Sequence, residues 1–290
     1  TPTSSTTGAT FAWSRAAVAG ISEGASSGAV SINETLTNTT ATPINVTYVV
    51  VTSANGCSNA GQNVVVTVNP IPVLSSTQTP AAICSGATFS YTPTSLTTGS
   101  TFGWSRAAVG GITEGASSGS GAINETLTNT TSAPIAVTYV IVTSANSCSN
   151  TPGQNVVVVV EPVPSVVNPG NQVLCAGAST TAIDFVTTGV GTQYNWTNTN
   201  STIGLPLSGS GNIASFTAVN TGTAPVTATI TVTPVYNGCT GSNQVFTITV
   251  NPIPVLSTTL TPGAICSGTA FSYTPTSSTT GATFAWSRAA

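Results

Sequence analysis

Side chains that carry out acid–base, nucleophilic or metal chemistry are scarce in this 290-residue sequence. It has three arginines, no lysine and no histidine, so it cannot assemble a Ser-His-Asp or Cys-His catalytic arrangement. It has no CxxC motif and a single aspartate, Asp184, which leaves no recognisable pattern of metal ligands. The glutamates are Glu23, Glu34, Glu114, Glu125 and Glu161. We therefore expect no enzymatic activity, no catalytic residue, no bound metal and no cofactor.

The glutamates recur at a constant distance, but not throughout the chain. Glu114 follows Glu23 by 91 residues and Glu125 follows Glu34 by 91 residues, whereas residues 162–250 contain no equivalent of either pair. A pair of glycosidase carboxylates is therefore not predicted. Arg106 precedes Glu114 by eight residues, and we expect the two side chains to form a structural ion pair across a hairpin. The alternative is that this arginine belongs to a ligand site.

The cysteines follow the same spacing. Cys57, Cys148 and Cys239 are 91 residues apart, and so are Cys84, Cys175 and Cys266. Two cysteines at fixed places in each repeat are typical of disulfides formed in an oxidising compartment. We predict the intradomain pairs Cys84–Cys148 and Cys175–Cys239, each stabilising its domain by about 4 kcal/mol, with Cys57 and Cys266 paired outside these residues. The alternative pairing joins Cys84 to Cys239 of the next domain.

A longer repeat explains these spacings. The sequence TPTSSTTGATFAWSRAA occupies both 1–17 and 274–290, and an imperfect copy occupies 92–108. The repeating unit of 91 residues has the size of a small domain, and NPIP or EPVP marks each boundary. We call the resulting segments repeat 1 (1–69, the C-terminal part of a domain), repeat 2 (70–161, complete), repeat 3 (162–250, complete and divergent) and repeat 4 (251–290, an N-terminal part). We expect these residues to be a window on a longer periodic polypeptide; the alternative is a finite subunit.

The elements that must position these side chains are all strands. Segments such as IAVTYVIVTS and QNVVVVVEP alternate in character and are rich in Val, Ile, Thr and Tyr, and clusters of Gly, Asn, Ser and Pro separate them. About seven short strands per repeat predict an all-β fold of two-sheet antiparallel sandwiches. The predicted core anchors, one tryptophan per repeat, are Trp13, Trp104, Trp196 and Trp286. A carbohydrate-stacking role is the alternative for these side chains.

The joints between repeats are short. Prolines alternate in the linkers, as at Pro70 and Pro72, and few residues separate the last strand of one repeat from the first strand of the next. Because proline fixes φ, we expect semi-rigid joints. The predicted assembly is an extended rod in which each domain adds roughly 35–45 Å.

The composition excludes several kinds of partner. Charged residues make up 3% of the chain and its net charge is −3, so nothing would neutralise a nucleic acid backbone or bind an anionic lipid surface. No apolar run has the length of a membrane-spanning helix. The predicted partners are neighbouring repeats of the same long chain, lateral copies of itself and a surface or glycan ligand of unknown identity.

Several strings resemble a known family. CSGATFSYTPT, INETLTNTTSAPIAVTYVIVTSANSCSN and LCAGASTTAIDF, together with the spacing of the PxP linkers, are similar to PKD-like (Ig-like) repeats. Such repeats fill very large surface proteins of Bacteroidota, including SprB-like gliding-motility adhesins. The resemblance implies tandem Ig-like/PKD-like sandwiches, export by type IX secretion and attachment to the outer membrane.

Three functions are consistent with this resemblance. The first is a stiff stalk that holds the binding tip of a giant adhesin away from the cell. The second is a self-assembling surface fibre or sheath whose repeats pack laterally, which low charge favours because little repulsion separates neighbours. The third is a spacer in a secreted hydrolase. The long identical repeat favours the stalk.

Overall fold

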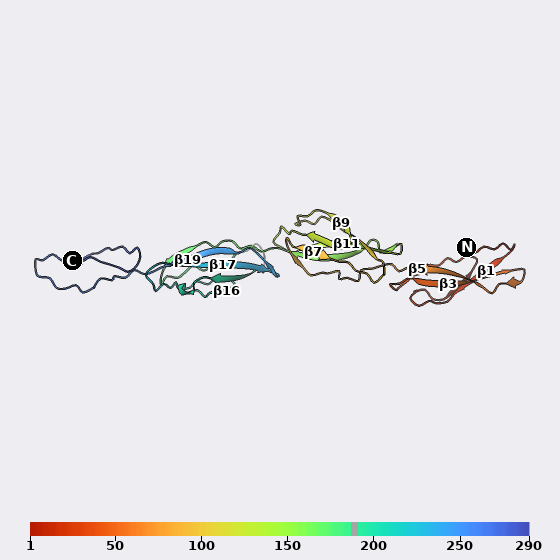
Figure 1. The fold of residues 1–290 in the computed structure, drawn as a ribbon, viewed down its shortest axis with the longest axis horizontal. Coiled ribbons are helices and arrows are strands. Elements are labelled where there is room, and N and C mark those ends of the chain that lie inside the picture. The colour runs from red at the N-terminus through yellow and green to blue at the C-terminus, as the bar shows by residue number, and fades with distance from the viewer. Residues whose placement is uncertain (187–190, 290) are drawn as a thin grey trace. The chain divides into compact units, whose positions relative to one another are not determined.

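The structure is a computed structural model that describes residues 1–186 and 191–289 (Figure 1). The chain divides into two compact units, one of residues 1–128 and 135–160 and the other of residues 129–134 and 161–290. Among the described residues the regular elements are strands and one short 3-10 helix. The predicted all-β class is therefore confirmed.

Repeat 1 forms one five-stranded sheet. Its strands are β1 (Thr10–Arg15), β2 (Ser26–Ala29), β3 (Ile44–Ala54), β4 (Cys57–Ser58) and β5 (Gln62–Val68). The order is β2-β1-β3-β4, and β5 lies beside β3 (Figure 1). The long strand β3 is the centre of this sheet because β1, β4 and β5 all pair with it.

Repeat 2 adds a second layer to the same design. Its strands are β6 (Ile83–Cys84), β7 (Thr88–Tyr91), β8 (Thr101–Arg106), β9 (Ser117–Ser120), β10 (Ile123–Thr126), β11 (Ile135–Ala145), β12 (Cys148–Ser149) and β13 (Gln154–Glu161). One sheet has the order β6-β13-β11-β8-β9 with β12 on β11, and β7 pairs with β10 in the other. The rings of Phe89 on β7 and Tyr139 on β11 lie 5.3 Å apart, so the two sheets pack face to face as a sandwich.

Repeat 3 keeps this arrangement. Its elements are β14 (Gln172–Cys175), β15 (Gln193–Asn198), the 3-10 helix η1 (Ser201–Ile203), β16 (Ser208–Ser210), β17 (Val226–Tyr236), β18 (Cys239–Thr240) and β19 (Gln244–Asn251). β14 pairs parallel with β19, which differs from the expected purely antiparallel sandwich. The facing layer is held by isolated bridges, including Ile183 with Ile213.

Repeat 4 has little regular structure in its described residues. A single isolated bridge joins Leu256 to Ser277. Most of its side chains are exposed, including Phe271, Phe284 and Trp286. These residues form no closed core of their own.

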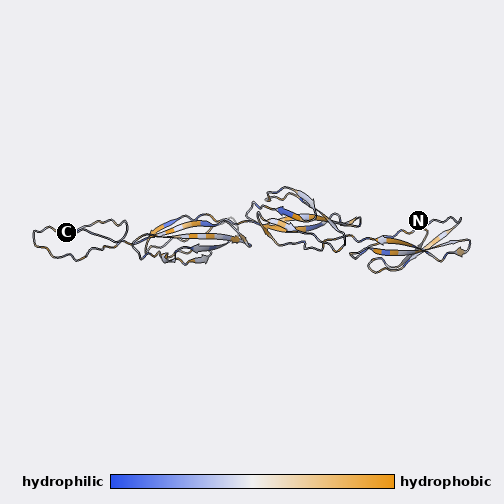
Figure 2. Cartoon of the chain, viewed as in Figure 1, coloured by the Kyte–Doolittle hydropathy of each residue, from blue (hydrophilic) through white to orange (hydrophobic). Residues whose placement is uncertain are grey.

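The cores of repeats 2 and 3 follow from strand alternation. On β11 the side chains of Val137, Tyr139 and Ile141 are fully buried, and on β17 those of Ile230 and Val232 are fully buried. The residues between them point to the other face, because successive strand residues alternate. Figure 2 shows this alternation as orange bands along the strands.

A tryptophan lies over a glycine of the neighbouring strand in the larger sheet of repeats 2 and 3. Trp104 pairs with Gly119, and Trp196 pairs with Gly209. A methyl group on Gly119 would lie 2.6 Å from Cζ2 of Trp104, and one on Gly209 would overlap Cζ2 of Trp196. Only glycine therefore leaves room for the indole ring.

Three of the four predicted tryptophan anchors pack against a core. Trp13 and Trp196 are buried, and Trp104 is half-buried against the core of repeat 2. The prediction for Trp286 is wrong in this structure, because its side chain is 90% exposed. The reason is that repeat 4 contains no equivalent of β11, the strand against which the other tryptophans pack.

Candidate functional site

The most concentrated polar chemistry in the described residues surrounds Arg106, at the end of β8. The arginine is 3% exposed. Its Nε donates to Oε2 of Glu125 at 2.9 Å, and its Nη2 donates to the carbonyl of Gly115 at 2.7 Å. Tyr139, which pairs with Arg106 across the sheet, donates its hydroxyl to the same Oε2 of Glu125. Ser117 donates to Oε1. We call Arg106, Ser117, Glu125 and Tyr139 the Arg106 cluster.

The predicted ion pair between Arg106 and Glu114 is wrong. Glu114 does lie beside the arginine, but through its backbone carbonyl, which accepts from Nη1 at 3.3 Å. Its carboxylate instead accepts from the backbone N–H of Thr128 at 2.8 Å. The carboxylate that reaches the guanidinium is Glu125, because β10 faces β8 across the core. The sequence held no signal that separates the two glutamates, since Arg15 precedes Glu23 by the same 8 residues and Glu34 by the same 19 residues.

The electrostatics of the cluster favour the charged forms of both partners. Burial opposes ionisation of Glu125, but the hydrogen bonds from Arg106, Ser117 and Tyr139 outweigh it, so the pKa of Glu125 is lowered. Burial and the neighbouring Glu125 carboxylate raise the pKa of Tyr139. A carboxylate whose pKa is lowered and a phenol whose pKa is raised are poorly suited to exchanging protons near neutral pH. The cluster is therefore a structural clamp that holds the loop after β8.

Repeat 1 contains the same clamp. Nε of Arg15 donates to Oε2 of Glu34 at 3.0 Å, and the hydroxyl of Tyr48 donates to that oxygen at 2.6 Å. The hydrogen bond from Arg15 is the main reason that the pKa of Glu34 falls to about 2. The cluster is therefore shared by repeats 1 and 2 and is not a single specialised site.

The cysteines differ from both predicted disulfides. Cys84 and Cys239 are disulfide-bonded, whereas Cys148 and Cys175 are free thiols, as are Cys57 and Cys266. The intradomain pairs Cys84–Cys148 and Cys175–Cys239 are therefore not formed.

The physical reason is that the two cysteines of one repeat lie at opposite ends of the sandwich. Cys175 pairs with Asn251, next to Val250, which pairs with the first residue of β17. Cys239 pairs with Tyr236, the last residue of β17. The ten steps from the first to the last of the 11 residues of β17 span about 33 Å, whereas a disulfide needs Cα atoms about 4–7 Å apart. In repeat 2, Cys148 likewise pairs with Ala145, the last residue of β11. Cys84 instead ends β6, which lies beside β13.

A residue at or just beyond the end of β5 and of β13 contacts an equivalent hairpin turn in each case. Next to the end of β5, Asn69 donates its side-chain amide to the carbonyl of Asn146 at 3.0 Å. At the end of β13, Oε2 of Glu161 accepts from the side-chain amide of Asn237 at 3.1 Å. Asn146 and Asn237 occupy equivalent positions in the turns after β11 and β17, and both have positive φ. These contacts link the end of one repeat's last strand to a turn in the repeat that follows.

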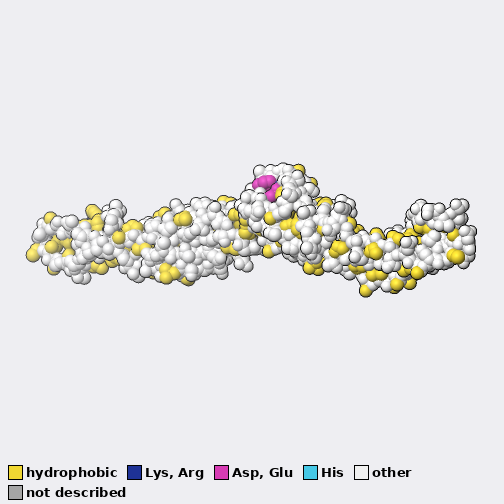
Figure 3. All heavy atoms as spheres, turned by 45° about the vertical axis from the view of Figure 1, so that its right-hand side comes forward, with side chains coloured by type: hydrophobic (Ala, Val, Ile, Leu, Met, Phe, Trp, Pro, Cys, Tyr) yellow, Lys and Arg dark blue, Asp and Glu magenta, His cyan; other side chains and the backbone are white. Residues whose placement is uncertain are grey.

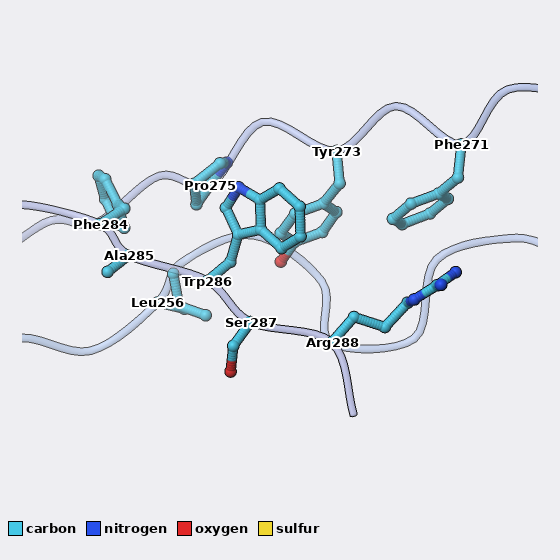
Figure 4. A pocket seen from close by; sticks show the side chains of 9 residues that line it. All are labelled: Leu256, Phe271, Tyr273, Pro275, Phe284, Ala285, Trp286, Ser287 and Arg288. Carbon is cyan, nitrogen blue, oxygen red and sulfur yellow. The ribbon is translucent and has the colours of Figure 1, made fainter. Parts of the chain in front are cut away.

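The clearest hollow is in repeat 4 and is apolar. Leu256, Phe271, Tyr273 and Trp286 line it. Figure 4 shows Phe271 and Tyr273 projecting from one segment, with Trp286 on the facing segment. The rings of Phe271 and Tyr273 are stacked 6.1 Å apart. Ser287 and Arg288 also belong to the lining, but most of it is apolar, so the hollow is an open hydrophobic half-core.

The surface offers few charged groups (Figure 3). The face shown is mostly polar and uncharged, with scattered hydrophobic side chains and one acidic patch. Within residues 1–186 and 191–289, no group of three or more acidic residues or cysteines is placed to hold a metal ion. No helix in the described part of the chain is long and apolar enough to cross a membrane.

Comparisons with solved structures find distant likenesses to chains of tandem immunoglobulin or cadherin domains. One is Dpr11 IG1 bound to DIP-gamma IG+IG2, at 9% identity and a TM-score of 0.34, covering 62% of this chain and 99% of that chain. Another is protocadherin gamma B2 extracellular cadherin domains 3–6, at 14% identity and a TM-score of 0.31, covering 84% and 67%. A third is Sidekick-1 immunoglobulin domains 1–4, at 13% identity and a TM-score of 0.23, covering 87% and 69%.

The family comparison is more specific. No curated protein matches the sequence. The family model described as a PKD-like domain matches residues 1–72 and 81–164, more than half of the chain. Modules of this kind are typically non-catalytic and extracellular, used in adhesion or recognition, and the disulfide-bonded Cys84 and Cys239 agree with an oxidising compartment. The chain belongs to the PKD-like domain family.

Proposed function

We propose that this chain is a non-enzymatic segment of the stalk of a large cell-surface adhesin, holding a binding tip away from the cell. The observation that carries the proposal is the recurring contact between a last strand and the following hairpin, Asn69 with Asn146 and Glu161 with Asn237. Equivalent sequence positions are used in both places, so the same contact recurs beside each linker. Repeated joints of one kind are what a long stalk needs.

The linker chemistry supports stiff joints. Pro70 and Pro72 follow Asn69, and Pro162 and Pro164 follow Glu161. Proline fixes φ at about −65°, which reduces the conformations open to each linker. Gly241 lies against the second of these linkers so closely that a methyl group on it would overlap the carbonyl oxygen of Pro164. Each linker is thus restrained both by its own prolines and by the hairpin beside it.

The finer identity rests on the resemblance of the sequence. The repeat strings are similar to those of giant gliding-motility adhesins of Bacteroidota, which implies type IX secretion and attachment to the outer membrane. The four segments 1–69, 70–161, 162–250 and 251–290 are the corresponding proposed domain boundaries.

Deletion of one 273-residue block from the full-length protein tests the stalk. The surface filament should become shorter by about 105–135 Å, at roughly 35–45 Å per domain, and cells should still attach. Filament length would be measured by negative-stain electron microscopy, and attachment by counting cells retained on glass under flow. Loss of attachment on deletion of a single block would show that the repeats bind the surface themselves.

The second candidate is a fibre or sheath in which repeats pack side by side. The observation that favours it is that 3% of residues are charged, so little electrostatic repulsion separates neighbouring copies. Electron micrographs distinguish the candidates. Filaments the width of one sandwich support the stalk, and bundles that persist after dilution support lateral packing.

A further inference from the structure

The first strand of repeat 3 lies parallel to its last strand. Along the pair of β14 and β19, Gln172 lies beside Ile248 and Cys175 lies beside Asn251. Just beyond β14, the backbone N–H of Ala176 donates to the carbonyl of Asn251 at 2.8 Å. The last residue of β19 is therefore bonded to the turn that follows β14.

Two side chains extend this contact towards the start of β19. The side-chain oxygen of Asn171 accepts from the backbone N–H of Thr247 at 2.8 Å. The side-chain amide of Asn168 donates to the carbonyl of Val245 at 3.4 Å. The segment that enters repeat 3 is therefore attached along most of the length of β19.

The chain enters and leaves repeat 3 at opposite ends of β19. At the entry, Gly241 lies between β18 and β19, and a methyl group on it would overlap the carbonyl oxygen of Pro164. The entry linker is therefore beside the start of β19. At the exit, Asn251 is the last residue of β19 and Pro252 follows it.

Tension along the chain would act on this strand pair as a shear. A pull on the entry linker draws β14 towards its own first residue, and a pull on the exit linker draws β19 towards its own last residue. Because the strands are parallel, they can only slide along each other, and the evenly spaced hydrogen bonds between them share the load. A hairpin pulled from its open end would instead lose its bonds one after another.

We propose that the pair of β14 and β19 is a load-bearing element, which keeps repeat 3 folded when the chain is pulled through its linkers. This function goes beyond setting the length of a stalk, and it rests on the proposed stalk, because a stalk transmits tension between the cell and its tip. The bond from Ala176 to Asn251 is nearest the exit linker, so it is loaded first.

Ala176→Pro removes this bond and preserves the local backbone. The N–H of Ala178 donates to the carbonyl of Cys175 at 3.1 Å, which closes a four-residue turn. The third residue of the turn, Gly177, has a φ of 86°. These features fit a type II turn, in which proline is common at the second position, the place of Ala176. The substitution therefore deletes one N–H and keeps the turn.

Val173→Pro is the matched control in the same strand. Successive residues of a strand alternate, so the N–H of Val173 points away from β19, towards the free edge of the sheet. The side chain of Val173 is 69% exposed. Proline at this position therefore removes an N–H but no bond to β19 and no core contact.

The experiment measures the lifetime of folded repeat 3 in the full chain under constant load. Amino acids with click handles replace Val163 and Ile253, which are 45% and 60% exposed, so that only repeat 3 lies between the handles. A reductant keeps every cysteine as a thiol. Ala176→Pro should shorten the lifetime roughly 3- to 10-fold, the effect of one hydrogen bond on an unfolding rate, and Val173→Pro should leave it within about twofold of native.

A second variant acts at the other end of the strand pair. Asn171→Ala removes the side-chain acceptor of the Thr247 N–H and leaves the backbone intact. It should also shorten the lifetime under load, and it tests the proposal even if Ala176→Pro prevents folding.

A second pulling direction separates load bearing from general stability. The exit handle is moved to Val245, which is 47% exposed near the start of β19. Both handles then lie at the entry end of repeat 3, the strand pair is not sheared, and Ala176→Pro should leave the lifetime unchanged.

Three outcomes overturn the proposal. They are an unchanged lifetime of both Ala176→Pro and Asn171→Ala between the first pair of handles, an equal loss in both pulling directions, and an equal loss in both proline variants. None of these outcomes bears on the stalk, whose test is filament length and attachment on cells.

Discussion

Repeats 2 and 3 use different side chains to hold the loop that follows β8 in repeat 2 and β15 in repeat 3. Arg106 pairs with Tyr139 in repeat 2, and Asn198 pairs with Ile230 at the equivalent place in repeat 3. Phe216 of repeat 3 stands where repeat 2 has Glu125. A charged, hydrogen-bonded group of three side chains is thus replaced by one amide and two apolar side chains.

The difference shows which part of the Arg106 cluster the fold requires. Asn198 donates its amide to the carbonyls of Leu205 and Pro206 at 2.9 and 3.2 Å, and Arg106 donates to the loop carbonyls of Glu114 and Gly115. Both repeats therefore place a donor at the end of this strand to hold the loop that follows. A carboxylate is needed only where that donor carries a charge, because an unpaired buried charge is costly.

Replacement of Arg106 by alanine is the change expected to separate the repeats most strongly. Glu125 loses its counter-ion and the loop carbonyls lose their donor, so the free energy of unfolding of repeat 2 should fall by about 3 kcal/mol. Amide hydrogen exchange of β11 measures this value without interference from the other repeats. Asn198→Ala, followed on β17, should cost about 1–2 kcal/mol because no charge is stranded. Equal losses in the two repeats would show that the charge is unimportant.

The tryptophan–glycine contact should behave alike in both repeats. Gly119→Ala and Gly209→Ala each place a methyl group inside the indole ring's space, and each should lower the free energy of unfolding by about 1–3 kcal/mol. Gly103→Ala is the control, because no atom lies within 4 Å of the added methyl group and repeat 1 has Ala12 at this place. Thermal unfolding followed by tryptophan fluorescence detects the shift. A cost confined to one repeat would contradict the shared design.

Acid should destabilise repeats 1 and 2 more than repeat 3. The folded-state pKa of Glu34 is lowered to about 2 and that of Glu125 is also lowered, whereas an unfolded glutamate titrates near pH 4.3. Their stabilisation is complete above about pH 5 and is lost as pH falls from about 4.3 towards the folded-state values. Hydrogen exchange at pH 3 and pH 6 should therefore show a larger loss of protection in β3 and β11 than in β17. Equal losses of protection in β3, β11 and β17 would show that the arginine–glutamate pairs do not cause the sensitivity to acid.

The smallest effect is expected when repeat 2 receives the chemistry of repeat 3. The combined change Arg106→Asn, Glu125→Phe and Tyr139→Ile removes both charges together, and replacement of a buried ion pair by packed apolar groups is often neutral. The free energy of unfolding of repeat 2 should stay within about 1.5 kcal/mol of its native value, despite the large loss expected for Arg106→Ala alone. Denaturant unfolding measures both variants side by side. A triple variant as unstable as the single one would show that the cluster itself is required.

Local patterns in the sequence predicted the strands well. The alternation in IAVTYVIVTS corresponds to β11, in which every second residue from Val137 is buried, and the tryptophans of the first three repeats lie in or against cores. These features depend on neighbours along the chain, so a period of two is enough to find them. Pairs that meet across the sandwich were not found in this way, because nearness in sequence favoured Glu114 over Glu125.

The sequence by itself determined the 91-residue repeat, the all-β class, the scarcity of catalytic groups and the membership of a repeat family, because all of these are local or periodic properties. Tertiary structure alone decided which carboxylate binds Arg106 and which end of the sandwich each cysteine occupies. The physical reason is that β10 reaches β8, and Cys175 is separated from Cys239, through the stacking and pairing of strands far apart in the chain. The number of residues between two positions in the sequence does not tell how far apart β10 and β8, or Cys175 and Cys239, lie in space.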